Sequence, residues 1–140
     1  MHKSIIEIEQ LLYRCCHAVD QRNIDNIMSV FHPNATLIIN WEETGKYSGH
    51  EEIRQWFFNY TQVMKSAVKY LRHKITCPVI EVNGDEATAF SYLDVDAAPK
   101  DASQVIITVC RYEDKFTKLD GQWYLKEKSI FMDDTYTIMK

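Results

Sequence analysis

The sequence is poor in the residues that break or cross-link a chain, with 4 glycines, 3 prolines and 4 cysteines among 140 residues. So little glycine and proline excludes a low-complexity or collagen-like chain. The 46% of hydrophobic and 26% of charged residues are typical of a globular protein. A chain of this length forms one domain that buries roughly two-thirds of its unfolded surface. We therefore predict a single domain over residues 1–140.

Basic runs and long apolar runs are also missing. With a formal net charge of −4 and no dense Lys/Arg segment, the chain lacks the basic surface that a nucleic-acid backbone requires. No stretch of about 18 apolar residues could span a membrane. Glu7 and Glu9 interrupt the only apolar run near the N-terminus, which argues against a signal peptide. We expect a cytoplasmic protein with neither a nucleic-acid nor a membrane partner.

Metal-binding and redox motifs are lacking as well. The cysteines form no CxxC pair, and the histidines show neither HxH nor HExxH spacing. The sequence therefore predicts no metal site. We expect reduced and mostly buried cysteines at Cys15, Cys16, Cys77 and Cys110.

Three segments have the apolar spacing of amphipathic helices. The first begins at Ser4, a predicted N-cap with Glu7 as its capping-box partner. Asn23 is the predicted cap of a short second helix, which ends before the "HPN" of residues 32–34. Ser48 or Gly49 opens the third helix.

Extended patterns account for most of the remaining chain. "ATLIINW" (35–41) predicts a strand with a short return strand, and four long strands follow the third helix. Turn residues separate the long strands, as in consecutive hairpins. The prediction is an α+β fold in which three N-terminal helices cover one face of a curved, cone-shaped, mixed or antiparallel sheet. The four long strands are predicted at 69–82, 86–96, 104–119 and 122–133.

The segment 104–119 has apolar residues on both of its faces. Val105, Ile107 and Val109 alternate with Ile106 and, further along, with Tyr112 and Phe116. A second apolar face needs a partner to cover it. We therefore expect a homodimer that forms through the sheet.

His73 is the most informative titratable residue. In "YLRHKITCPVI" (70–80) it shares the odd, apolar positions with Leu71 and Ile75, so it is predicted to face inward. A buried imidazole needs hydrogen-bond partners. His73 is either a core residue with satisfied hydrogen bonds or part of a site.

Asp20 lies near the end of the first predicted helix, at the border of its apolar face. It either terminates the helix by bonding local amides or faces a cavity edge. If Asp20 contacts one ring nitrogen of His73, it fixes the tautomer and leaves the other nitrogen free to exchange a proton with a ligand.

Several motifs, in this order, resemble the SnoaL-like branch of the nuclear-transport-factor-2-like superfamily. They are "YRCCHAVDQRNIDNIMSVFHPNA", "YSGHEEIRQWF", "RHKITCPVIEVNGDEATAFSYL" and "RYEDKFTKLDGQWYLKEKSIFM", and they span nearly the whole chain. The resemblance implies the α+β fold predicted above. The superfamily includes dehydratases, isomerases, polyketide cyclases, hydroxylase subunits and non-enzymatic modules.

Resemblance to the scytalone and bile-acid dehydratases of this superfamily implies site residues. Asp20 and His73 match their Asp late in the first helix and their His on the strand before the hairpin. Asp96, or Asp94 on the same strand face, matches an Asp of the bile-acid enzymes. Those enzymes have a tyrosine ahead of the Asp in the first helix, and this sequence has Cys15 at or near that position. Tyr13 is the candidate to take the place of that tyrosine.

An acid–base pair without a nucleophile suits dehydration, isomerisation or cyclisation of a small hydrophobic, carbonyl-bearing or polycyclic substrate. No metal or organic cofactor is required. The alternative is a non-catalytic ligand-binding module or a partner subunit of the same fold. The predicted catalytic residues are His73, Asp20 and Asp96, and the predicted cavity lining is Tyr13, Trp41, Trp56, Phe57, Tyr60, Phe90, Tyr92 and Phe131.

Overall fold

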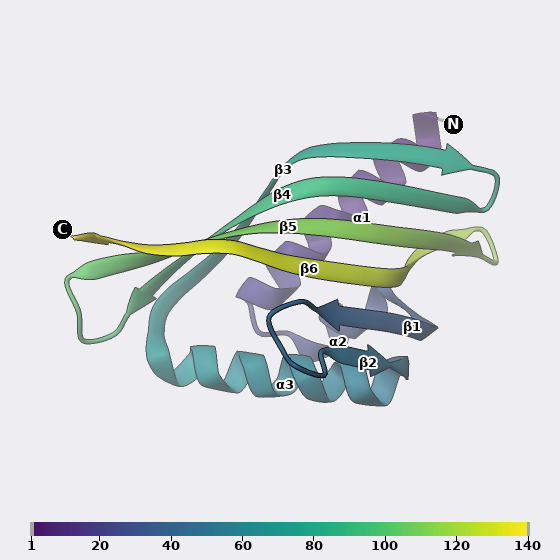
Figure 1. Cartoon of the computed structure of the whole chain (residues 1–140). Coiled ribbons are helices and arrows are strands. Elements are labelled where there is room, and N and C mark those ends of the chain that lie inside the picture. Colours follow the sequence, from purple (N-terminus) through teal and green to yellow (C-terminus); the bar gives the residue numbers. More distant parts are fainter. Residues whose placement is uncertain (1, 140) are drawn as a thin grey trace.

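The computed structural model describes residues 2–139 and contains three helices and six strands (Figure 1). Two short strands lie between the second and third helices, and four long strands follow in a meander. In chain order the elements are α1 (His2–Asp20), α2 (Ile24–Ser29), β1 (Phe31–Ile39), β2 (Lys46–Ser48), α3 (Gly49–Ala67), β3 (Val68–Asn83), β4 (Glu86–Pro99), β5 (Gln104–Leu119) and β6 (Gln122–Met139).

The helix ends agree with two of the three predicted caps. The Asn23 side chain accepts a hydrogen bond from the Asn26 backbone N–H at 3.0 Å, so Asn23 caps α2 as predicted. Helix α3 begins at Gly49, where Glu52 accepts from the Ser48 backbone N–H at 2.6 Å. The predicted Ser4 cap is wrong, because α1 already begins at His2 and Ser4 lies inside it.

The six strands form one mixed sheet in the order β2-β1-β6-β5-β4-β3. Neighbouring strands are antiparallel except β1 and β6, which are parallel. The predicted α+β class with a curved mixed sheet is therefore confirmed. Strand β1 starts at Phe31, earlier than predicted, because "HPN" belongs to the strand. Strand β6 extends to Met139, six residues beyond the predicted end at 133.

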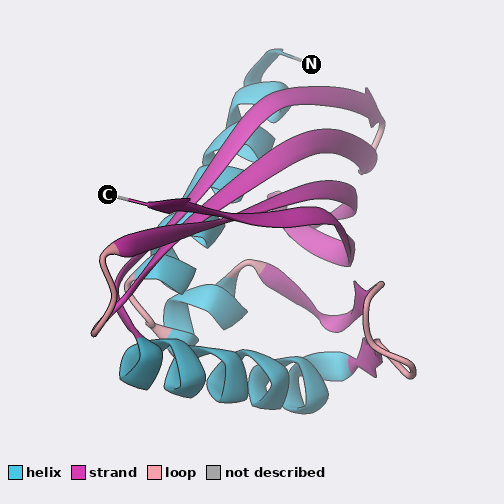
Figure 2. Ribbon diagram, turned by 60° about the vertical axis from the view of Figure 1, so that its left-hand side comes forward, coloured by secondary structure: helices cyan, strands magenta, loops and turns pink. Residues whose placement is uncertain are grey.

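The sheet bends around the helices, with α1 along its inner face and α3 beneath its β1 and β2 end (Figure 2). The core fills the space between these layers. Burying such side chains contributes about 1.5–3 kcal/mol each. Its largest fully buried apolar side chains are Phe31, Phe116, Ile8, Leu12, Ile27, Leu37, Ile39, Ile53, Leu93 and Leu125.

The sheet has several register shifts, and two of them bear on which side chains face inward near the cavity. In β3 the register with β4 shifts between Thr76 and Val79, where Cys77 has a φ of +53°. A bulge adds an unpaired residue and reverses the alternation beyond it. Cys77 is consequently exposed, whereas Cys15, Cys16 and Cys110 are buried, and all four are free thiols.

The second bulge lies where β5 pairs with β6. Phe116 is opposite Leu125 but Lys115 is opposite Glu127, so β6 holds one extra residue there. Inward-facing positions therefore pass from Leu125 to Lys128 rather than to Glu127. No helix within residues 2–139 is long and apolar enough to cross a membrane.

Candidate active site

A cavity of about 530 Å³ lies between the inner sheet face, α1, α3 and the loop after β1. This volume falls in the range of small-molecule sites. Four of the predicted lining residues, Trp41, Trp56, Phe57 and Tyr60, do line it. Further lining comes from Cys15, Cys16, Val19, Glu42, Tyr47, Asn59, Val63, Met64, Leu71, His73, Leu93, Val95, Ala97, Thr108, Cys110, Tyr112, Lys128, Ile130 and Met132.

His73 lines this cavity and contacts Asp20, which is not itself a lining residue. The His73 Nδ1 atom lies 2.6 Å from Asp20 Oδ1, and the His73 backbone N–H donates to both carboxylate oxygens at 3.0 Å. The His73 side chain is 8% exposed and the Asp20 side chain is 19% exposed. The contact predicted between them is therefore present. The carboxylate at Nδ1 fixes the tautomer, and Nε2 is left on the cavity side.

Tyr60 is the third member of this cluster. Its hydroxyl lies 3.4 Å from His73 Nε2. Burial, with a smaller contribution from the charge of Asp20, raises the pKa of Tyr60 well above its ordinary value. The hydroxyl therefore stays protonated at neutral pH and serves as a donor. With the Nδ1 proton directed at Asp20, Nε2 is the acceptor.

Aromatic packing holds Tyr60 in place. Its ring stacks on Trp56, with centroids 5.5 Å apart and planes at 7°. Trp56 donates from Nε1 to Glu42 at 3.2 Å, and the Tyr47 hydroxyl donates to the other oxygen of Glu42 at 2.7 Å. Glu42 thus ties the loop after β1 to α3 at the cavity.

Lys128, a second polar residue of the lining, forms a buried ion pair with Asp114. Lys128 Nζ lies 3.1 Å from both oxygens of Asp114, and the two side chains are 2% and 0% exposed. The same nitrogen lies 3.3 Å from the centroid of the Tyr112 ring, a cation–π contact. Burial raises the pKa of Asp114, and the charge of Lys128 opposes this effect.

Asp96 does not line the cavity, contrary to the prediction. Leu93, Val95 and Ala97 are the inward residues of β4. Side chains alternate along a strand, so Asp94 and Asp96 lie on the opposite face, where Asp96 pairs with Lys74 at 2.9 Å.

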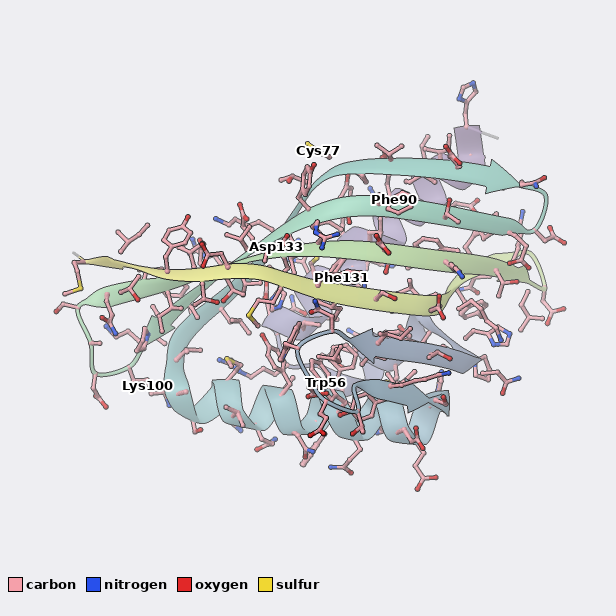
Figure 3. The ribbon with its side chains drawn as sticks, in the orientation of Figure 1. Trp56, Cys77, Phe90, Lys100, Phe131 and Asp133 are labelled. Atoms are coloured by element: carbon pink, nitrogen blue, oxygen red, sulfur yellow. The ribbon has the colours of Figure 1, made fainter. Side chains whose placement is uncertain are left out.

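Tyr13 and three aromatic residues of the sheet also lie outside the lining. Phe90 and Tyr92 are exposed on the outer face of β4, because the alternate residues Ala89, Ser91 and Leu93 face the core. Phe131 follows the β6 bulge, and its ring packs against the Arg111 guanidinium at 4.7 Å. Phe90 and Phe131 are on the sheet face turned away from α1 (Figure 3).

Sequence reasoning missed Glu42, Lys128 and Asp114. A period-two alternation from Trp123 places Glu127 inward and Lys128 outward, and only the bulge reverses this. Asp114 carried a usable signal, because it shares its strand phase with Tyr112 and Phe116. Within residues 2–139 no group of three or more His, Cys, Asp or Glu could hold a metal ion.

Residues 3–129 match the SnoaL-like domain family. The chain belongs to the SnoaL-like family. An uncharacterized protein of Mycobacterium tuberculosis (strain ATCC 25618 / H37Rv) is 29% identical over 120 residues, which cover 84% of this chain and 78% of that protein.

Solved structures with the same fold include two from Novosphingobium. The dehydrochlorinase LinA-type3 of Novosphingobium barchaimii LL02 has a TM-score of 0.82 and 18% identity, over 97% of this chain and 90% of that one. A provisionally assigned scytalone dehydratase of Novosphingobium aromaticivorans has a TM-score of 0.82 and 16% identity, over 95% and 86%. At such identities the SnoaL-like chain shares their fold, and the similarity extends no further.

Proposed function

We propose that this SnoaL-like protein is a cofactor-independent acid–base enzyme, a dehydratase, isomerase or cyclase that acts on a small hydrophobic carbonyl compound. The observation that carries the proposal is the contact of Asp20 with Nδ1 of His73, beside a cavity of about 530 Å³. A carboxylate that orients an imidazole, whose other nitrogen lies on the cavity side, is the arrangement that general acid–base catalysis needs.

The proposed step is removal of a proton from the carbon beside a carbonyl group. His73 Nε2 takes the proton, and the electron pair of the broken C–H bond forms the double bond of an enolate. Asp20 stabilises the imidazolium. Once Nε2 carries the proton it no longer accepts from Tyr60, so the Tyr60 hydroxyl donates to the enolate oxygen instead. Return of the proton to another carbon gives isomerisation. Its transfer to a leaving hydroxyl group, with expulsion of water, gives dehydration.

The rest of the lining supports an uncharged, hydrophobic substrate. Aromatic and aliphatic side chains dominate it, and Trp56 stacks on Tyr60, which contacts His73. A water-poor site strengthens the electrostatic interactions of the dyad with the reacting atoms.

Hydrogen–deuterium exchange tests this proposal without knowledge of the natural substrate. We expect the wild-type protein in D₂O to accelerate exchange at the α-carbon of enolisable ketones such as 2-tetralone and 2-acetonaphthone. His73→Gln should reduce the acceleration at least 100-fold while the protein stays folded, because general acid–base catalysis contributes about 10²–10⁴-fold. The matched control His17→Gln changes an exposed histidine of α1 and should exchange like the wild type.

The same experiment addresses the alternative, a non-catalytic ligand-binding module. Two observations support that alternative. The cavity lining is mainly apolar, and Asp96, a predicted catalytic residue, lies outside it. The enzymatic proposal would be refuted if ketones bind but their α-carbon exchange does not depend on His73. Equal exchange rates in the wild type and His73→Gln would also refute it.

A further inference from the structure

The buried pair of Lys128 and Asp114 has no part in the proposed proton transfer. Buried ion pairs are weak stabilisers, and well-packed apolar residues of similar volume often replace them without loss of stability. The fold itself therefore does not explain why a lysine lines an otherwise apolar cavity. Lys128 is 2% exposed and Asp114 is fully buried, so bulk water does not solvate this pair.

Lys128 has one N–H that no oxygen or nitrogen of the described residues accepts, since the two oxygens of Asp114 take two of its donors. Its ammonium group has three N–H donors. Among residues 2–139, Asp114 alone accepts hydrogen bonds from it, and the Tyr112 ring lies over one side. Because the carboxylate already balances the charge, an uncharged oxygen acceptor fits this position better than a second anion. A carbonyl oxygen is such an acceptor.

The pair lies far along the cavity from His73. Lys128 is opposite Asp114, which is opposite Ala89 of β4, whereas His73 is opposite Val95. From position 89 to position 95, a strand rises about 20 Å at 3.3 Å per residue. This rise separates backbone positions, and the side chains of Lys128 and His73 both extend into the cavity that they line. One carbonyl group still cannot contact both ends.

Cys16 of α1 lines the same cavity as His73 and Lys128. Burial raises its pKa to about 12, and among the smaller contributions Lys128 lowers this pKa while Asp20 raises it. Both charges therefore act on one side chain of the lining. One ligand in this cavity can contact both His73 and Lys128, because both line it.

We propose that Lys128 donates a hydrogen bond to a second oxygen acceptor of the ligand, so that the substrate is an elongated apolar molecule with a carbonyl oxygen at each end. This inference rests on the proposed function for the placement of the reacting carbonyl at His73. Asp114 positions Lys128 and balances its charge.

Two matched probes test the inference by binding. The first is 2,6-diacetylnaphthalene, and the second is 2-acetyl-6-isopropenylnaphthalene, in which a CH₂ group replaces one carbonyl oxygen. We expect the wild type to bind the diketone about tenfold more tightly, since a charged donor forms the extra hydrogen bond. In the double variant Lys128→Met/Asp114→Val, the two probes should bind with about equal affinity. The control Lys126→Met removes a nearby lysine that bonds the Asn34 carbonyl instead, and should keep the preference.

A measurement on the wild type covers the case in which the double variant does not fold. In ¹⁵N-lysine NMR spectra, we expect the diketone, but not the matched probe, to shift the resonance of the buried ammonium group. Equal affinities in the wild type, a preference that survives in the folded double variant, or an unchanged lysine resonance would each overturn the inference. The ketone-exchange experiment does not use Lys128, so failure of the proposed function is seen separately.

Discussion

Replacement of Asp20 by alanine should destabilise the protein far more than the removal of an exposed aspartate. Asp20 accepts hydrogen bonds from the backbone N–H and from Nδ1 of His73, and thereby joins the end of α1 to β3. Hydrogen bonds to charged groups contribute about 1.5–3 kcal/mol, and a buried donor left without its partner costs about 1–3 kcal/mol. Because these terms overlap, we expect Asp20→Ala to lose about 2–4 kcal/mol of unfolding free energy.

Urea denaturation followed by circular dichroism measures this loss. Asp20→Asn keeps an acceptor for the His73 backbone N–H, so we expect it to lose about half as much as alanine. The matched control is Asp25→Ala, which removes an aspartate that is 83% exposed although it lies 2.7 Å from Arg54. Exposed ion pairs contribute about 0–1 kcal/mol.

The reasoning fails if Asp20→Ala and Asp25→Ala cost the same free energy of unfolding. It also fails if Asp20→Asn is as unstable as Asp20→Ala, because the backbone hydrogen bond would then contribute nothing. A changed denaturant slope would show that the unfolded or native state has altered, and thermal unfolding would then replace urea.

Two further predictions concern the thiols and the outer sheet face. At pH 8 a disulfide reagent should modify Cys77 alone in the native protein and four cysteines after unfolding. The reason is that burial raises the pKa of Cys15 and Cys110 to about 11 and of Cys16 to about 12. Rapid modification of more than one thiol in the native protein would contradict this prediction. The homodimer through the sheet stays a prediction. Exposed Phe90 and Tyr92 lie beside Arg111 and Glu113 on the outer face. In two copies related by a two-fold axis, the arginine of one copy can pair with the glutamate of the other. Sedimentation should give a dimer that Phe90→Glu dissociates, whereas a wild-type monomer at high concentration would exclude it.

The amino-acid sequence alone determined the fold class and one half of the site. Apolar periodicity separated three helices from the long strands, and turn residues marked the hairpins, since local patterns report secondary structure directly. The inward position of His73 followed from simple alternation, because no bulge lies between it and Leu71. The helix pattern left Asp20 either a helix terminator or a residue at a cavity edge, and the family resemblance implied the second. The structure brings Asp20 to His73.

Only the tertiary structure decided which residues surround the cavity beyond that pair. The β6 bulge turns Lys128 inward and Phe131 outward, and the β3 bulge exposes Cys77. Both bulges depend on pairing with a neighbouring strand, so neither can be recognised from one strand's alternation. Asp96 lies outside because β4 presents Leu93, Val95 and Ala97 to the cavity, and alternation then places Asp96 on the opposite face.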